Sequence, residues 1–589
     1  MKKIISAVLA SVMIFGAMVG LSSCGEPKDA GAEISVYLGE TIYDFDPTDY
    51  YANDNAAQLM SLLYEPLFKV NSKGEIKCAG ASSYKVNEKE RTIVINLRET
   101  YWSDEVRVKA ADYIYAWREL ILNPNNANPA AALFYGIENA AEIKAGVDGV
   151  SLYSFGAKDT GVYEITIKYN KNASYKQILK NLASIATSPA RQDVVSVAQG
   201  YWSKSMSSIV TNGPFKLKEL GVETGDLSLA RNLGYHQKST VTDYTEKVNP
   251  AELISFTTTA GQTLELTYAD IANKTVFYMG DATLADRAAN KSKAKTADLL
   301  STYTYVFNTE NELFAIKEVR QALSLALDRD AIASAITYAK AAKGFLPDKV
   351  AKSIYGKKVT SRLDESLTEA QALVDSVFAS GGAGYGLSKS FTLTVNNDEE
   401  SLAIALCAQS AWSTLGFDVT IKAVGYTSEV IVDSTTSEEI TIVDSEIQRL
   451  VKEASYGNRE FDVIGIDWQM YSTDAFVALS AFSSSLNGNG RDFSTGDNRL
   501  CIAGWWNSDY DSYINAAFSA TKDSDRDAAL KEAEKILLEE CPVIAVVHNT
   551  NFAYTHKHLT KIGTDIFGNF SFTSAKLKNY EKYLSSDEE

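Results

Sequence analysis

The chain has 589 residues, enough for several domains, and its 45% hydrophobic and 22% charged residues are typical of a globular protein rather than a disordered one. Its net charge of −18 argues against a nucleic-acid binder, because phosphate neutralisation requires clustered Lys and Arg. Five cysteines in a chain of this length exclude a disulfide-rich scaffold.

The first residues have the pattern of an export signal. Two lysines precede an uncharged stretch, Ile4 to Leu21, that is rich in Ala, Gly and Ser. A transmembrane anchor is the alternative, but no cationic stop follows the stretch. The tetrapeptide Leu21-Ser22-Ser23-Cys24 resembles a bacterial lipobox, in which the cysteine thiol is acylated and becomes the new N-terminus. We expect a signal peptide over 1–23, lipidation of Cys24, a tether over 24–32, and attachment to the extracytoplasmic face of the cell membrane.

Hydrophobic spacing predicts both strands and helices in the first half of the chain. Apolar residues alternate over 93–97 and 163–169, which is the signal of a half-buried strand. Over 110–121 they lie 4, 3 and 4 residues apart, and the same pattern returns over 316–327. These two segments are expected to be amphipathic helices.

The clearest unit lies between Phe391 and Val424. Alternation over 391–395 predicts a strand, the stripe over 405–415 a helix that Gly416 can end, and alternation over 417–421 a second strand. Such a βαβ unit requires parallel sheet with covering helices. The sequence therefore predicts a mixed α/β protein with more than one domain.

Two further segments complete the prediction. A last helix is expected over about 525–540, with Leu530 and Leu537 on one face. The segment 428–439 is heavy in Ser, Thr, Asp and Glu and is interpreted as a solvent-facing excursion.

Catalytic and metal-binding motifs are sparse. The chain has no G-x-S-x-G elbow, no H-E-x-x-H and no phosphate-binding G-x-x-x-x-G-K-[ST] loop. His556 and His558 could offer two nitrogens to a metal, but no third ligand is near in sequence, so we interpret them as exposed histidines and expect no metal and no cofactor. Export would permit a disulfide between Cys501 and Cys541, which spacing alone cannot establish.

Several blocks in register resemble the extracellular solute-binding proteins of ATP-driven peptide importers, the oligopeptide- and dipeptide-binding family 5 of bacteria. The first block is "YDFDPTDYYANDNAAQLMSLLYEPLF", with Phe45-Asp46-Pro47 and Tyr64-Glu65-Pro66-Leu67 at the places of a Leu-Asp-Pro turn and a Tyr-Glu-Gly-Leu motif. Trp102-Ser103-Asp104 and the segment "TNGPFKLKEL" match two more blocks. A signature of the second half is carried by Asn308, Thr309, Val319, Arg320, Ala322, Leu323, Ala326, Asp328 and Arg329.

The resemblance implies the two-lobed type II fold of periplasmic binding proteins, with an additional inserted domain. The expected division is a hinge-side lobe of 33–67, 186–300 and 541–589, an inserted domain over 68–185 and a second lobe over 301–540. The ligand is expected to be buried between lobes that close by hinge motion.

The resemblance also implies where a peptide would be held. Trp468 matches an interior tryptophan of the family, although a plain core aromatic is an equal interpretation. The family follows this tryptophan with an aspartate that binds the amino end of the ligand, but Tyr471 stands at that position here. A shift of three residues would let Asp474 accept the ammonium group instead.

Three other residues belong to the predicted site. Asn53 and Asp54 fall where the family pairs its backbone with the peptide, and Asn308 is either a ligand contact or a turn residue. Asp46-Pro47 is interpreted as a turn. The signature residues Arg320, Asp328 and Arg329 are expected on helix surfaces, without a binding role.

The expected function is that of a monomeric, lipid-anchored receptor that captures an extracellular peptide and delivers it to a permease with cytoplasmic ATPases. It would catalyse no reaction and bind no nucleic acid. Because the anchoring aspartate is missing, a glycan or a metal chelate stays open as the ligand. An extracellular hydrolase is a further alternative.

Overall fold

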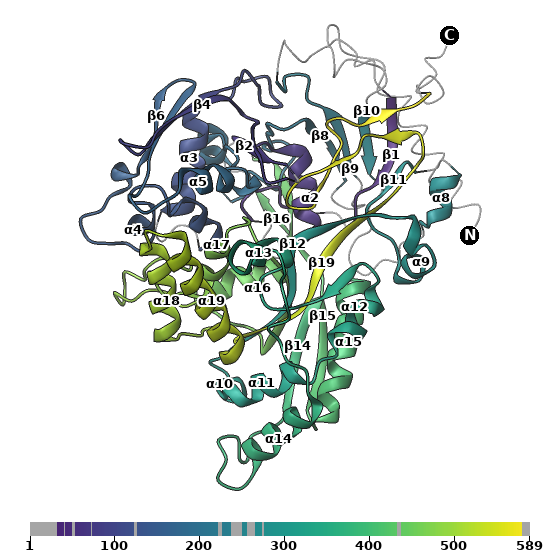
Figure 1. Cartoon of the computed structure of the whole chain (residues 1–589). Helices are drawn as coiled ribbons and strands as arrows, with labels where there is room; N and C mark the ends of the chain where they lie inside the picture. The colour runs from purple at the N-terminus through teal and green to yellow at the C-terminus, as the bar shows by residue number, and fades with distance from the viewer. Residues whose placement is uncertain are drawn as a thin grey trace.

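The structure is a computed structural model that describes residues 32–39, 42–49, 54–71, 73–122, 127–198, 200–221, 227–236, 250–255, 266–273, 276–432 and 437–579. Figure 1 shows two stacked parts, with the purple and blue segments and the end of the chain above and the green segments below. Within the described ranges, no helix has both the length and the apolar character that crossing a bilayer requires.

One 11-stranded sheet runs through both parts, in the order β15-β14-β18-β12-β19-β11-β1-β10-β9-β8, with β13 paired to β19. Its centre is the antiparallel pair β12 (Lys295–Phe307) and β19 (Val543–Thr555), whose register shifts between Asp298 and Thr302 and between Tyr303 and Thr304. The other strands are β1 (Ala32–Tyr37), β8 (Phe215–Leu220), β9 (Leu227–Arg231), β10 (Pro250–Ser255), β11 (Tyr278–Met279), β13 (Ala339–Ala341), β14 (Ser390–Asn396), β15 (Asp418–Val424) and β18 (Val463–Gln469). We call the part on the β11 side the first lobe and the part on the β18 side the second lobe.

The predicted βαβ unit is confirmed in the second lobe. Strands β14 and β15 pair in parallel, and helix α15 (Glu399–Thr414) connects them. Gly416 has φ +82° just after the helix, a left-handed conformation that glycine adopts without a steric penalty. The helix buries Trp412, whose indole N–H donates to the carbonyl of Leu323 at 2.8 Å.

A separate antiparallel sheet lies within the segment predicted as the inserted domain. It has the order β4-β5-β7-β6, formed by β4 (Ala81–Asn87), β5 (Thr92–Leu97), β7 (Glu164–Lys168) and β6 (Ala157–Gly161). Helix α3 (Ala110–Ile121) packs near it and buries Tyr113 and Trp117. The two predicted strands and the predicted helix are confirmed, while the exact domain boundaries stay a prediction.

The remaining helices follow the apolar spacing of the sequence. The first lobe contains α2 (Asp54–Leu63), α4 (Ala140–Lys144), α5 (Tyr175–Asn181), α6 (Gln192–Val197), α8 (Tyr268–Ala272) and the 3₁₀ turn η1 (Pro129–Phe134). Helix α9 (Leu284–Ala289) packs with Leu284 on the second-lobe core and pairs Arg287 with Glu400 of α15. The second contains α10 (Glu312–Ala315), α11 (Lys317–Leu325), α12 (Arg329–Ile336), α13 (Asp348–Tyr355), α14 (Leu367–Phe378), α16 (Glu446–Ser455), α17 (Ala475–Leu479), η5 (Ser480–Phe482), α18 (Ser508–Ser519) and α19 (Asp523–Glu540). The helices expected over 316–327 and 525–540 are α11 and α19.

Two signature arginines lie in the core, so the prediction of helix-surface positions is wrong for them. Arg320 and Arg329 are buried. Arg320 donates to the carbonyls of Phe314 and Glu540, both at 2.6 Å, and Arg329 donates to that of Ala545 at 2.8 Å. A guanidinium can satisfy several carbonyls at once, which makes its burial tolerable. Arg320 thus links α11 to the end of α19, and Arg329 links α12 to the start of β19.

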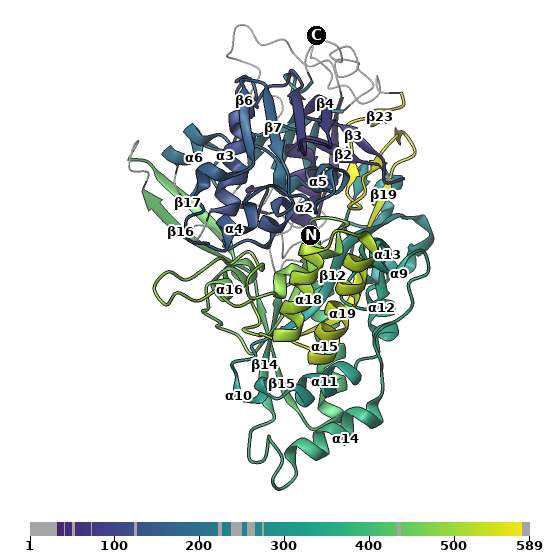
Figure 2. The ribbon, with the colours of Figure 1, turned by 60° about the vertical axis from the view of Figure 1, so that its left-hand side comes forward.

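The acidic segment interpreted as a solvent-facing excursion is a β-hairpin that reaches the other lobe. Strands β16 (Tyr426–Val432) and β17 (Glu439–Ser445) pair antiparallel. Ile442 is buried in a small core with Ala198 and Tyr201. Figure 2 shows the green hairpin rising beside the blue helix α6. The described residues of 428–439 are exposed apart from the half-buried Ile431, so the solvent-facing interpretation holds for that segment. The buried contact with the first lobe is made just beyond it, at Ile442.

The structure also tests the possible Cys501–Cys541 disulfide and the expected exposure of His556. Cys78, Cys407, Cys501 and Cys541 are free, so the structure has no Cys501–Cys541 disulfide. His556 is buried rather than exposed, with its ring at 77° to that of Phe277. Among the described residues, no group of three or more His, Cys, Asp and Glu is placed to hold a metal ion.

Candidate binding site between the two lobes

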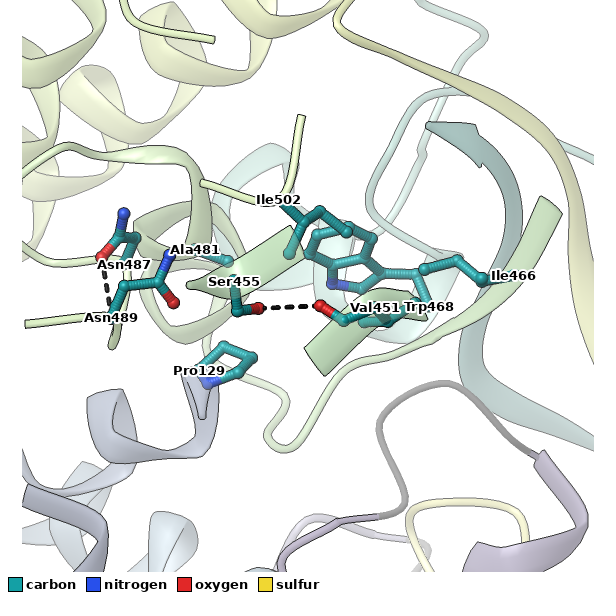
Figure 3. Close-up of a pocket in the computed structure, with 9 residues that line it drawn as sticks. All are labelled: Pro129, Val451, Ser455, Ile466, Trp468, Ala481, Asn487, Asn489 and Ile502. Carbon is teal, nitrogen blue, oxygen red and sulfur yellow. Dashed lines mark hydrogen bonds between the residues drawn. The ribbon is translucent and has the colours of Figure 1, made fainter. Parts of the chain in front are cut away.

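A cavity lies where the lobes meet, and its volume is about 20 Å³. Figure 3 shows the lining residues: Pro129 on the blue ribbon of the first lobe, and Val451, Ser455, Ile466, Trp468, Ala481, Asn487, Asn489 and Ile502 of the second lobe. A space of this size has room for about one water molecule. The lobes are therefore closed on each other at this point.

Trp468 forms one wall of this cavity. It lies in β18 opposite Thr302 of the central strand β12. Its ring stacks on that of Phe482, with the ring centroids 4.9 Å apart. It is nearly perpendicular to the ring of Phe345, and those centroids are 5.5 Å apart. Such aromatic contacts fix a side chain beyond what area burial alone provides. The structure thus makes Trp468 both a packed aromatic and a cavity wall.

A tight loop of the second lobe faces Pro129. The side-chain amides of Asn487 and Asn489 donate to the carbonyls of Arg499 and Leu500 at 2.7 and 2.6 Å, so both side chains hold the loop itself. Gly488 between them has φ +83°, and a Cβ there would lie 2.5 Å from the carbonyl oxygen of Asn128. The lobes approach here as closely as backbone atoms allow.

Next to this contact lies a segment that we call the acidic loop, with Asp44, Asp46 and Asp49. One carboxylate oxygen of Asp46 accepts from the backbone N–H and the hydroxyl of Thr48, both at 2.8 Å. The carbonyl of Thr48 in turn accepts from the amide of Asn128 at 2.6 Å. Because Asn128 precedes Pro129, the acidic loop adjoins the cavity. Its side-chain bonds to Thr48 agree with the predicted turn at Asp46-Pro47.

Two lysines bridge the acidic loop to the second lobe. Lys204 contacts Asp44 at 3.8 Å and also pairs with Asp444 of β17, while Lys452 of α16 lies 3.7 Å from Asp49. Burial raises the pKa of Asp46 to about 7, and the charges of Asp49 and Asp44 add to this effect. Burial likewise raises the pKa of Asp44. Burial is the main cause in both residues, and repulsion between the neighbouring carboxylates acts in the same direction.

Of the residues predicted to hold the ligand, Trp468 and Tyr471 lie at this place. Tyr471 is buried, and its hydroxyl donates to the carbonyl of Thr48 at 3.3 Å, so it touches the acidic loop directly. Asn53 lies outside the described residues, as does Cys24, and Asp54 is the first residue of α2.

Asn308 lies apart from the cavity. Its side chain accepts from the N–H of Glu310 at 3.1 Å and donates to the carbonyl of Arg459 at 3.4 Å. It stands six residues beyond Thr302 along the direction of β12, which corresponds to about 20 Å of extended chain. These contacts match the turn interpretation of Asn308.

Asp474 is already engaged by a cation of the protein. Both carboxylate oxygens lie 2.8 Å from Nη2 of Arg526, and one of them also caps α17 by accepting from the N–H of Phe476. The residue is only 4% exposed. A ligand ammonium would have to displace Arg526, so the structure gives Asp474 a structural role in place of the expected one.

Sequence reasoning missed the acidic loop as a candidate site. The signal was visible as the three aspartates of "DFDPTD", but it was interpreted only as a turn. The lysines that meet it, Lys204 and Lys452, lie about 160 and 400 residues further along the chain. No periodic pattern could bring them together.

Comparisons with known proteins agree with this architecture. The model of the bacterial extracellular solute-binding proteins, family 5 Middle, matches residues 75–490. The periplasmic murein peptide-binding protein MppA of Escherichia coli is 26% identical over 84% of this chain and 83% of its own length. The oligopeptide-binding protein OppA of Bacillus subtilis is 24% identical over 95% and 96% of the two chains.

Solved structures share the fold. OppA of Listeria monocytogenes bound to peptide has a TM-score of 0.73 at 20% identity, and the match covers 93% of this chain and 99% of that one. One structure of MppA has a TM-score of 0.73 at 22% identity, covering 93% and 98% of the two chains. Its unliganded open form has a TM-score of only 0.54 over 93% and 97%. The chain thus has the two-lobed type II fold, in an arrangement unlike that open form.

Proposed function

The chain belongs to the bacterial extracellular solute-binding proteins of family 5, and from this premise we propose that it binds a peptide between its two lobes. The family match over 75–490 carries the proposal, because it spans most of the chain, including the aromatic wall at Trp468. The two relatives described above, MppA and OppA, are named for peptide binding.

The chemistry of a peptide suits an enclosed site of this kind. Each peptide amide costs several kcal/mol if it loses water without gaining a hydrogen bond. Main-chain pairing in a cleft satisfies the amides whatever the side chains are. Because this cavity has room for only about one water, a peptide could occupy it only if the lobes moved apart. Binding is therefore coupled to opening and closure.

Delivery and anchoring complete the proposal. The protein would pass its peptide to a permease whose energy comes from cytoplasmic ATPases, and it would itself catalyse no reaction. Acylated Cys24 would hold it at the extracytoplasmic face of the membrane. This part is supported by the charged start, the apolar stretch and the Leu21-Ser22-Ser23-Cys24 motif.

The ligand class can be tested on the protein as it is purified. Native mass spectrometry, followed by denaturation, identifies the small molecules that leave with the chain. We expect a mixture of short peptides that stay intact on prolonged incubation. A single sugar or metal chelate would overturn the peptide proposal, and accumulation of cleavage products would indicate a hydrolase.

The anchor is tested separately. Metabolic labelling with a radioactive fatty acid should mark the wild-type chain and leave Cys24→Ser unlabelled, and the variant should move from the membrane fraction to the soluble extracytoplasmic fraction. Label on the Cys24→Ser chain would contradict lipidation at this residue.

A further inference from the structure

The acidic loop carries more negative charge than the surrounding cations neutralise. Four carboxylates, those of Asp44, Asp46, Asp49 and Asp444, share the two ammonium groups of Lys204 and Lys452. Among the described residues, no ion pair within 4.0 Å involves Asp46, and only one of its oxygens accepts the bonds from Thr48. A carboxylate held between two closed lobes without a cation is costly.

A buried hydroxyl beside these carboxylates also has no partner. Tyr64 is 2% exposed, and within the described part of the chain its hydroxyl makes no hydrogen bond. Its pKa is raised by burial and then by the charges of Asp46 and Asp44, so the hydroxyl lies within the electrostatic field of the acidic loop. Tyr115 adds a partly buried ring, and its pKa is raised to about 12 by burial, by Glu119 and by Asp46. A buried hydroxyl without a hydrogen bond is unfavourable, so it marks a place for another polar group.

The surroundings favour an organic cation over a metal ion. The three aspartates do not form a group that could hold a metal, a statement that covers the described residues. Aromatic rings beside carboxylates are suited to ammonium and guanidinium groups, which gain from both. The loop touches Tyr471, and Asn128 links it to the cavity wall at Pro129, so a group of the ligand could reach it from the cleft.

We propose that the acidic loop, with Asp46 at its centre, receives a cationic group of the bound peptide, an ammonium or a guanidinium. This inference rests on the proposed function. The ligand supplies the third positive charge that the loop lacks, and the hydroxyl of Tyr64 can accept one of its N–H groups. In the family, an aspartate after the interior tryptophan supplies the negative charge that binds the amino end of the ligand. Here Tyr471 is uncharged and Asp474 is paired with Arg526, so the acidic loop of the first lobe would supply that negative charge instead.

The proposal has a consequence for pH. The charged and titratable groups around Asp46 are Asp44, Asp49, Tyr64, Tyr115 and Lys452, with Lys204 beside Asp44. Burial raises the pKa of Asp46 to about 7 and also raises that of Asp44. A cation binds the ionised form, so affinity should be greatest above pH 7 and should fall as protonation removes the charge. Between pH 8 and pH 6 the ionised fraction of Asp46 falls about tenfold. The affinity for arginine-containing pools should follow it, because the guanidinium stays charged over this range, whereas a free amino end is partly deprotonated at pH 8.

The experiment uses four pools of random peptides three to six residues long, built from Ala, Gly, Val, Leu, Ser and Thr. One pool has free amino ends, one is acetylated, and two more contain a single arginine with the amino end free or acetylated. Calorimetry on the full-length protein gives the apparent affinity of each pool. The pools separate an amino-terminal cation from a side-chain cation.

We expect a pool with a cationic group to bind the wild type at least about tenfold more tightly than the acetylated pool without arginine. In Asp46→Asn the ratio of the affinities for the cationic and the acetylated neutral pools should fall below about threefold. Asp159→Asn removes an exposed charge from β6 and serves as the matched control, which should keep the full preference.

Three outcomes would overturn the inference. An undiminished preference in Asp46→Asn would show that the charge lies elsewhere. Equal binding of all pools by the wild type would remove the cationic subsite and leave the proposed function standing. Failure of every pool would instead overturn the proposed function itself. If Asp46→Asn does not fold, the pH series on the wild type decides, because an affinity for arginine-containing pools that is flat between pH 8 and pH 6 contradicts the proposal.

Discussion

At the scale of single residues, Glu65 shows how a buried charge can be held by its neighbours. It is almost fully buried and contacts Lys69 at 2.7 Å, the ring of His236 and the hydroxyl of Tyr235. Burial alone would raise its pKa, but Lys69 and His236 lower the pKa to about 2. This cluster joins the start of β2 (Phe68–Val70) to the end of the described 227–236 segment.

The sign of its effect on stability follows from that lowered pKa. Stability from Glu65 is fully present above about pH 4.5, the ordinary pKa, and is lost as the pH falls toward 2. Over this window the wild type should lose about 3 kcal/mol more unfolding free energy than Glu65→Gln. Urea unfolding at several pH values measures the difference. The control is Glu75→Gln, which removes an exposed ion pair with Lys77 and should change the dependence of stability on pH little. If wild type and Glu65→Gln lose stability in parallel as the pH falls, the prediction is refuted.

At the scale of elements, the β16–β17 hairpin extends from the second lobe and packs against the first lobe. Ile442 is 3% exposed against Ala198 and Tyr201, while Val432 on the same hairpin is 63% exposed. We expect Ile442→Ser to weaken the closed arrangement by about 1.5–3 kcal/mol, the value of burying one such side chain. Affinity for the free-amine pool should fall about tenfold or more because closure is coupled to binding. Val432→Ser should bind like the wild type, and equal affinity of both variants would mean that the hairpin does not hold the lobes.

The elements also show what the sequence could and could not predict. The helices over 110–121 and 525–540 and the βαβ unit at 391–424 were predictable because each buries a face with a regular period. The contact of the hairpin with the first lobe was not, because Ile442 and its partners Ala198 and Tyr201 lie more than 200 residues apart in the sequence. The buried Arg320 and Arg329 were missed for a related reason, since their partners are carbonyls near residue 540. Trp468 was predicted for the site, but the acidic loop depends on contacts across some 400 residues.

At the scale of the whole molecule, Gly488 limits how far the lobes can close. Gly488→Ala places a Cβ 2.5 Å from the carbonyl of Asn128 and also strains a backbone at φ +83°. We expect the lobes of this variant to rest further apart, with a larger radius of gyration in X-ray scattering and about tenfold weaker binding of the free-amine pool. Gly74→Ala shares the backbone strain, at φ +79°, but has no atom within 4 Å of the new Cβ. If both variants scatter and bind alike, contact at Gly488 does not set the closed position.

The central pair β12 and β19 joins residues some 250 positions apart in the sequence. During synthesis the middle of the sheet therefore stays incomplete, because β12 has no neighbour on one side until residues 543–555 have been made. Until then Ile544 and Val546 are missing from the second-lobe core that they help to fill. The order of synthesis itself delays completion of the fold, which suits a polypeptide proposed to thread through a membrane before it becomes compact.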